Sequence, residues 1–338
     1  MVTMADVAAR AGVSTSTVSR ALKDHPRISK ATCLRIQKIA KELGYQPSPL
    51  VRALMESRRG SKEREICTLA FITDDCGQED WEKKPTCGQT FQGVVARAKE
   101  LGYRIDVLST REFNLERNQL EKVLVARGIP GAIFGFSQAK MPAFPIDLSN
   151  LAVVGLASYF SSLSLDRVKT HSFQNVELGL RKLRERGFGK IGLVVPAYNN
   201  ELVGGGWTAA ALEDARNLPE HMCCPPLVIE ESRYTAKRFF SWFDKYQPDA
   251  LLVYKVPVLS FLKLRLLRVG KDIGVAWIFR EMQKSSAGVD ADYEEAGAAL
   301  VDLLVSKLQA NDLGLRQRNR HLLIDGYWID GPSANKQG

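Results

Sequence analysis

Side chains that suit contacts with DNA are concentrated in a ten-residue stretch near the N-terminus. Short hydroxyl side chains let a backbone come close to a phosphate group and donate hydrogen bonds to it. A guanidinium about one helical turn further along can reach the O6 and N7 atoms of a guanine. The candidate DNA-contacting residues of this stretch are Ser14, Thr15, Ser16, Thr17, Ser19, Arg20 and Lys23.

The distribution of charge favours the same partner. Residues 1–65 carry 13 Lys and Arg against 6 Asp and Glu, a net charge of +7, whereas the other 273 residues carry 34 against 32, a net charge of +2. A basic segment on a nearly neutral body indicates a polyanion partner, because each phosphate contact releases counterions from DNA.

Two short helices around an Ala-Gly-Val-Ser turn would hold these side chains in place. The first helix ends at Gly12, which can adopt the left-handed conformation, and Ser14 is a good N-cap for the second helix, 15–22. A third helix begins at Ser29 and ends at Gly44. The residues that this third helix is expected to bury are Leu34, Ile36, Ile39, Ala40 and Leu43. The pattern predicts a helix-turn-helix unit, supported by a third helix.

The N-terminal region resembles the lactose/galactose repressor (LacI/GalR) family of bacterial transcription regulators in two segments, DVAARAGVSTSTVSRAL (6–22) and ELGYQPS (42–48). The resemblance implies that Thr15, Ser16 and Arg20 read base edges in the major groove. It also implies that Tyr45 helps to seat the headpiece on the DNA backbone. Over the rest of the chain the resemblance continues with much lower specificity.

A hinge helix is expected at 48–57, because Ser48 can cap it and Pro49 suits its first position. So short a helix is not stable alone in water. The resemblance implies that it orders when two subunits meet on a pseudo-palindromic operator, so that the partners are double-stranded DNA and a second copy of the chain. Leu54 would then enter the minor groove and kink the duplex. Val51 stands where the family commonly has alanine.

Beyond residue 65, apolar runs of strand length alternate with helical patterns, which predicts parallel sheets of the doubly wound α/β type. The expected fold is an all-α helix-turn-helix headpiece joined to a two-lobed, parallel-sheet effector domain like that of periplasmic binding proteins. The expected divisions are a headpiece over 1–46, a hinge and linker over 47–65, a first lobe over about 66–165 and 288–320, and a second lobe over about 166–287 and 321–332.

Ligands of such sheets bind outside the carboxyl ends of the strands, so the space between the lobes is the expected effector site. This chain departs there from the family pattern: His171-Ser172 replaces a common Asp-Asn pair, Val203 replaces an arginine, and Lys255-Val256 replaces Asn-Asp. Aromatic and cationic groups stand near these positions, which favours a small anion such as a sugar acid or a phosphorylated sugar over a neutral sugar. The candidate effector-binding residues are Trp207, Tyr254, Lys255, Trp277, Phe279 and Arg280.

Signals for other functions are weak. No nucleotide-binding glycine motif occurs, the four histidines are scattered, and the six cysteines include no CxxC pair, so we expect no enzyme activity, cofactor or metal. No apolar run is long enough to cross a membrane and no secretory signal is evident, so a cytoplasmic location is expected. Two alternatives stay open: a regulator that represses constitutively because its effector cleft has decayed, and a small-molecule-binding module related to periplasmic sugar receptors.

Overall fold

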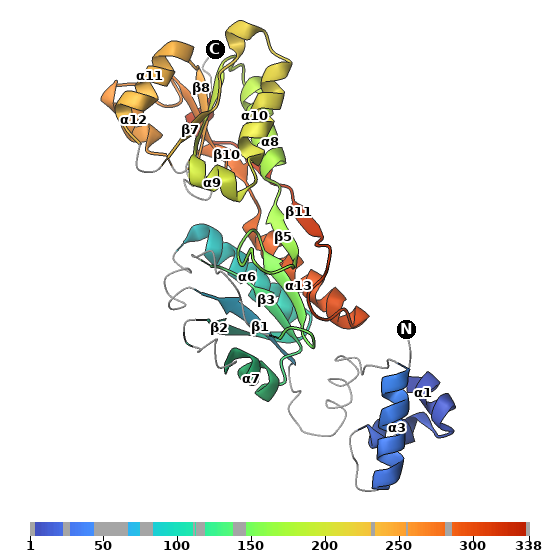
Figure 1. The fold of residues 1–338 in the computed structure, drawn as a ribbon. Helices are drawn as coiled ribbons and strands as arrows, with labels where there is room; N and C mark the ends of the chain where they lie inside the picture. Colours follow the sequence, from blue (N-terminus) through green and yellow to red (C-terminus); the bar gives the residue numbers. More distant parts are fainter. Residues whose placement is uncertain are drawn as a thin grey trace.

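The computed structural model describes residues 4–22, 28–43, 67–74, 84–110, 112, 119–137, 147–230, 234–254, 256–280 and 286–335. These residues form a three-helix headpiece and two α/β lobes, each built on its own six-stranded sheet (Figure 1). The predicted fold class is thereby confirmed. The expected hinge helix at 48–57 lies outside the described residues.

The headpiece consists of α1 (Met4–Ala11), α2 (Thr15–Ala21) and α3 (Lys30–Glu42), which pack around a small apolar core of their own. Gly12 takes the left-handed conformation at the end of α1, with a φ of 66°, as predicted. Ser14 and Ser29 cap α2 and α3, and each side chain accepts a hydrogen bond from a backbone N–H three residues on.

One residue of α3 is not where the sequence analysis placed it. Leu34 is 62% exposed, whereas Cys33, Ile36 and Ala40 are buried. Positions 33, 36 and 40 follow the spacing of one helix face, and Leu34 falls outside that face. Apolar character alone therefore gave the wrong assignment for Leu34.

The sheet of lobe one has the order β11-β5-β4-β3-β1-β2, and all its strands are parallel. Figure 1 shows α6 and α13 together on one side of this sheet, with α7 on the other, so that both faces are covered. The strands of lobe one are β1 (Cys67–Thr73), β2 (Tyr103–Ser109), β3 (Gly131–Phe134), β4 (Ala152–Leu156), β5 (Asp166–Thr170) and β11 (His321–Ile324). Its helices are α6 (Pro85–Glu100), α7 (Gln119–Ala126) and α13 (Tyr293–Ala310).

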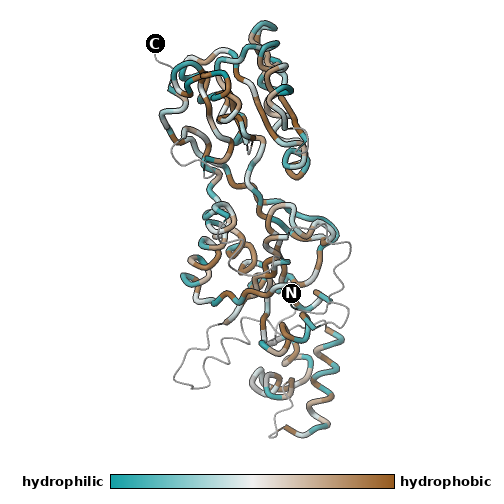
Figure 2. The backbone as a smooth tube through the Cα atoms, turned by 90° about the vertical axis from the view of Figure 1, so that its left-hand side faces the viewer, coloured by the Kyte–Doolittle hydropathy of each residue, from teal (hydrophilic) through white to brown (hydrophobic). Residues whose placement is uncertain are grey.

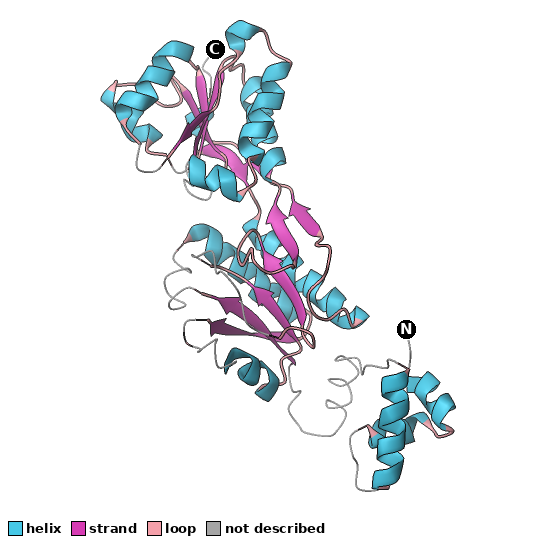
Figure 3. Ribbon diagram, in the orientation of Figure 1, coloured by secondary structure: helices cyan, strands magenta, loops and turns pink. Residues whose placement is uncertain are grey.

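The sheet of lobe two has the order β12-β10-β9-β8-β6-β7, with only β12 antiparallel to its neighbour. Helices α8 and α10 cover one face, and α11 and α12 cover the other (Figure 3). Its strands are β6 (Ile191–Pro196), β7 (Leu227–Ile229), β8 (Ala250–Val253), β9 (Gly274–Trp277), β10 (Ala287–Asp290) and β12 (Tyr327–Ile329). Its helices are α8 (Ser172–Glu185), α9 (Ala197–Leu202), α10 (Gly206–Arg216), α11 (Ala236–Tyr246) and α12 (Val258–Leu264), with short 3-10 turns at Glu220–Met222 and Pro332–Ala334.

The chain passes between the lobes three times, after β5, after β10 and after β11. The lobe boundaries expected from the sequence are corrected at these strands. Residues 166–170 and 321–324 pair in the sheet of lobe one, and residues 288–290 pair in that of lobe two. Strand pairing decides which lobe a crossing segment joins, and the apolar pattern of one strand does not reveal its partner.

The apolar interior of each lobe is continuous along the strands, and Figure 2 shows brown stretches inside each lobe, surrounded by coils in which teal and brown alternate. One charged cluster interrupts this pattern in lobe one. The side chain of Asp166 on β5 is fully buried and accepts hydrogen bonds from the backbone and guanidinium of Arg320. Lys307 of α13, also buried, lies 3.7 Å from Asp166 and 2.9 Å from Asp312. The cluster ties α13 and the segment before β11 to the sheet.

Candidate DNA-binding surface and effector region

The second helix of the headpiece presents its N-terminal end to solvent. Thr15 and Arg20 are exposed, as is the capping residue Ser14. Thr17 is half-buried, and its hydroxyl lies 2.9 Å from that of Ser14. Ser14 and Thr17 are therefore occupied in capping, and Thr15 and Arg20 remain available to a groove.

For the other candidate DNA-contacting residues, the structure describes the backbone alone or lies silent. Ser16 and Ser19 lie within α2, and their backbones are helical. Lys23, Tyr45, Ser48 and Leu54 lie outside the described residues, so their roles stay predictions.

Helix α3 fixes the angle between α1 and α2. The guanidinium of Arg35 donates to the carbonyl of Ala11 at 3.4 Å, and the amide of Gln37 donates to the carbonyl of Ala21 at 3.3 Å. Each bond satisfies a carbonyl at the C-terminal end of a helix, where no intrahelical donor is available. Sequence analysis missed both residues, although each is a polar residue beside the buried face of α3.

The aromatic residues predicted to bind an effector are brought together in part. The ring centroids of Trp207, Tyr254 and Phe279 lie 4.9–5.8 Å apart, and Tyr293 of α13 adds a fourth ring 5.5 Å from Phe279. Trp207 is 1% exposed, and the first three rings belong to the core beneath α8 and α10. These rings pack against one another rather than lining an open surface.

The remaining candidates do not join this cluster. Trp277 packs in the core on the opposite face of the sheet from Trp207 and Tyr254, whereas its neighbour on the strand, Ala276, belongs to the same core as Trp207. Arg280 follows β9 and donates from Nε to the carbonyl of Ser286 at 3.1 Å. Lys255 lies outside the described residues.

The strand ends of lobe one carry polar groups that sequence analysis overlooked. Asp74 follows β1 and is almost fully buried, and its carboxylate accepts a hydrogen bond of 2.6 Å from Ser137, which follows β3. Thr73 donates to the carbonyl of Phe136 at 2.8 Å. Their position directly after buried strands could have revealed them, because carboxyl ends of parallel strands meet at one edge.

The first and third crossing segments are hydrogen-bonded to one another. His171, between β5 and α8, lies 2.7 Å from Asp325 through Nδ1, and its backbone N–H donates to Ile324. Asn175 of α8 is completely buried and accepts a bond of 3.0 Å from the backbone N–H of Gly326. These bonds tie the first and third crossings together.

A further bond joins the lobes away from the crossings. Ser158, in the loop after β4, donates to the carbonyl of Leu202 in α9 at 2.9 Å. The buried guanidinium of Arg167 holds that loop through bonds to several of its carbonyls, among them Tyr159 at 2.6 Å and Phe160 at 2.9 Å. Burial lowers the pKa of Arg167 from its ordinary value. This loop positions Ser158 against lobe two.

Within the described residues, no group of three or more His, Cys, Asp or Glu side chains is arranged to hold a metal ion. No helix in that part of the chain is both long and apolar enough to cross a membrane. All five cysteines found there are free thiols.

Comparison with known proteins links the headpiece to one family. Residues 3–48 match the family described as "Bacterial regulatory proteins, lacI family". The chain is 28% identical over 193 residues to the HTH-type transcriptional repressor CytR of Escherichia coli (strain K12), covering 57% of this chain and 53% of the relative. It is 25% identical over 195 residues to the ribose operon repressor of Haemophilus influenzae, covering 57% and 54%. The matched region thus spans about half the length of these relatives.

Solved structures share this architecture over most or nearly all of the chain. The lac repressor dimer bound to operator and the anti-inducer ONPF superimposes with a TM-score of 0.55 at 19% identity, covering 98% of this chain and 99% of that one. A putative LacI-family regulator from Rhizobium etli gives a TM-score of 0.58 at 14% identity, covering 79% and 98%. At such identities the likeness establishes the fold alone. Residues 3–48, which contain the helix-turn-helix unit described above, match the LacI family of bacterial regulatory proteins.

Proposed function

We propose that this protein is a sequence-specific transcriptional repressor that binds a pseudo-palindromic operator as a homodimer in the cytoplasm and has no catalytic activity. The observation that carries the proposal is the family match over residues 3–48 together with the exposed Thr15 and Arg20 on α2. A helix of this kind enters the major groove and presents its first turns to base edges.

The relatives support this function. The two matched by sequence are named as repressors, and the superimposed lac repressor is a dimer bound to its operator. Two identical headpieces related by a two-fold axis read two inverted half-sites, which gives the operator its symmetry.

Selection of binding sites from a pool of random duplexes tests the proposal. The full chain should enrich one sequence with two inverted half-sites, and a single half-site should bind far more weakly. A variant carrying Thr15→Ala and Arg20→Ala serves as the control and should enrich no sequence. Enrichment of unrelated sequences by both proteins would contradict the proposal.

We further propose that a small ligand binds between the lobes and alters operator affinity by changing their relative orientation. Asp74 and Ser137 offer hydrogen-bonding groups for hydroxyls at the strand ends of lobe one. Arg280 supplies a cation after a strand of lobe two. A ligand that satisfies both lobes would carry hydroxyls and an acidic group, as a sugar acid or a phosphorylated sugar does.

A second candidate is a constitutive repressor without an effector, and the packing of Trp207, Tyr254 and Phe279 favours it. Against it stands the indole N–H of Trp207, which is buried with no acceptor among the described residues. Such a group costs about 1–3 kcal/mol, which a ligand or a change in lobe orientation could recover.

A thermal-shift panel of neutral sugars, sugar acids and sugar phosphates separates the candidates. A ligand present at 100 times its dissociation constant adds about 2.7 kcal/mol to the stability of the folded state. Stabilisation by acids or phosphates alone supports the anionic effector, and stabilisation by neutral hexoses alone contradicts it. No shift with any compound supports the constitutive repressor.

A further inference from the structure

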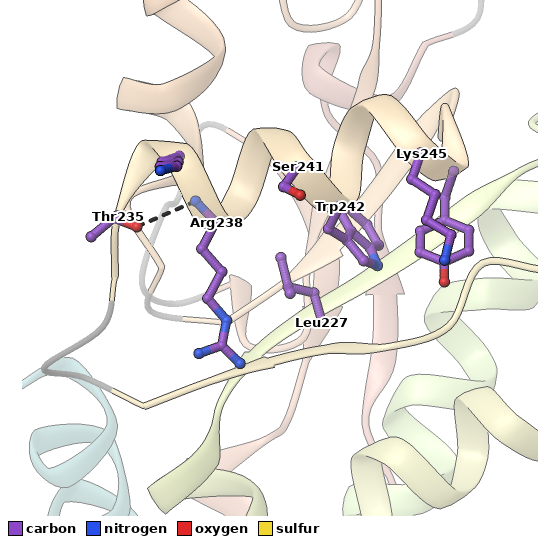
Figure 4. Close-up of a pocket in the computed structure, with 8 residues that line it drawn as sticks. Leu227, Thr235, Arg238, Ser241, Trp242 and Lys245 are labelled. Atoms are coloured by element: carbon purple, nitrogen blue, oxygen red, sulfur yellow. Dashed lines mark hydrogen bonds between the residues drawn. The ribbon is translucent and has the colours of Figure 1, made fainter.

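An open depression of about 460 Å³ lies on lobe two, between α11 and the edge strand β7 (Figure 4). Its volume falls within the range of small-molecule sites, roughly 300–1,000 Å³. Every residue that lines it belongs to lobe two, so it is separate from the crossing segments and from the headpiece.

Helix α11 divides the surroundings of the depression into an apolar and a basic part. Phe239 and Phe243 are buried against the sheet. Lys237, Ser241 and Lys245 follow one another at a spacing of four residues, which places them in one line along the helix. From Lys237 to Lys245 the line spans eight residue steps, about 12 Å at 1.5 Å per residue.

Among the described residues, the cations of the depression lack the salt-bridge partners that neighbouring arginines have. On the same lobe, Arg265 is paired with Asp244 and Arg268 with Asp272. Within the described part of the chain, by contrast, neither Lys237 nor Arg238 forms a salt bridge, and the lining contains no carboxylate. The ammonium of Lys245 lies 5.1 Å from the ring of Tyr246. Cations gathered without counter-charge repel one another, and a bound anion would relieve this repulsion.

The rest of the lining adds a polar end and an apolar floor. Thr235 caps α11 by accepting from the backbone N–H of Arg238 at 3.3 Å, so the positive end of the helix opens at the same place as Lys237. Leu227 and Trp242 form the floor, and the indole N–H of Trp242 is fixed by a 2.9 Å bond to Pro225. Figure 4 shows Arg238 and Trp242 extending from α11 toward β7.

We propose that this depression binds a small organic polyanion, with its phosphate or carboxylate groups against Lys237 and Arg238 and its apolar part over Leu227 and Trp242. The length of the basic line matches a molecule the size of a nucleoside diphosphate. A stable interface with a protein partner would bury about 800 Å² on each side, far more than this depression offers.

Calorimetric titration of the full-length protein with ADP tests the proposal, with pyrophosphate as a second probe. We expect ADP to bind at one site per chain and pyrophosphate to bind more weakly, because it lacks a part that covers the floor. The double variant Lys237→Gln, Arg238→Gln should raise the dissociation constant for ADP by about tenfold or more, through loss of charge-assisted contacts.

The matched control is the double variant Lys263→Gln, Lys271→Gln, which removes the same charge from exposed positions of lobe two outside the depression. It should bind ADP as the parent protein does, even though the basic headpiece also attracts anions. Equal weakening in both double variants, or no binding of ADP at millimolar concentration, would overturn the proposal. Binding of a hexaglutamate peptide but not of ADP would also overturn it and assign the depression to an acidic segment of a partner protein.

Discussion

Arg20 is the residue on which sequence specificity should depend most. It is exposed on α2, one helical turn beyond the hydroxyl-bearing N-terminus, where a bidentate contact to guanine is possible. Arg20→Ala should therefore cost on the order of 1–3 kcal/mol on the selected operator and relax the preference at one position of each half-site. Binding measured on operators substituted at each position reveals this directly.

Lys23→Ala is the matched control for Arg20→Ala, because it removes the same charge from the segment just after α2. A contact to phosphate carries no sequence information, so Lys23→Ala should weaken binding to all duplexes similarly and reduce the salt dependence. If Arg20→Ala weakens binding to operator and to random DNA equally, Arg20 contacts phosphate rather than a base, as Lys23 is expected to do.

At the scale of elements, the buried cluster around Asp166 holds β5, α13 and the segment before β11 together. Burial by itself raises the pKa of Asp166, but the hydrogen bonds from Arg320 and the charge of Lys307 outweigh it, so the pKa lies below the ordinary value of 3.8. A carboxylate of this kind stabilises the fold at pH values above the pKa of the unfolded chain. The stabilisation is lost as the pH falls below about 4.

Asp166→Asn should therefore lower the free energy of unfolding at neutral pH by on the order of 3 kcal/mol, since it removes the charge that pairs with Arg320 and leaves the buried Lys307 with Asp312 alone. It should also flatten the fall in stability on acidification. Denaturant unfolding at a series of pH values measures both effects. Asp302→Asn removes from α13 a half-exposed carboxylate that pairs with Arg97 of α6, and it should change stability little. An equal loss in the two variants would show that the cluster contributes no more than a surface pair.

The hinge segment provides a second test at this scale. If Leu54 enters the minor groove, Leu54→Ala should reduce both DNA bending and operator affinity, because unstacking a base step is offset only by the contacts that the kink permits. Gel mobility of circularly permuted operator fragments measures the bend. Leu50→Ala is the control, and unchanged bending by Leu54→Ala would indicate that Leu54 is only a packing residue.

For the whole molecule, the crossing segments decide how the lobes are oriented. A Cβ added at Gly326 would lie 2.5 Å from the carbonyl oxygen of Asp290 and 2.7 Å from Oδ1 of Asn175. Gly326→Ala should therefore displace the third crossing, cost about 1–3 kcal/mol of stability and change operator affinity. Small-angle scattering detects the change in lobe orientation.

Gly206→Ala is the matched control. A Cβ added at Gly206 would meet its nearest atoms at 3.6 Å, so this variant should leave the scattering profile unchanged. Identical profiles for both variants would mean that Gly326 does not control the orientation.

The headpiece was predictable from the sequence because its determinants are local. The cap at Ser14, the left-handed Gly12 and the apolar spacing in α1 and α2 all act within one or two helical turns. The alternation of strands and helices in the body was readable for the same reason. Even locally, however, the inward face of α3 was misjudged at Leu34, since several apolar residues competed for it.

Only the tertiary structure decided which lobe each crossing strand joins and which aromatic side chains are buried. Residues 166–170 pair with residues 321–324, more than 150 positions away, through backbone bonds to which side-chain pattern gives no clue. Trp207, Tyr254 and Phe279 come from three separate elements and meet in the core, so neither their contact nor their burial could be inferred from spacing. Sequence determines local structure through short-range sterics and hydrogen bonds, whereas the burial of a side chain depends on which distant segments pack against it.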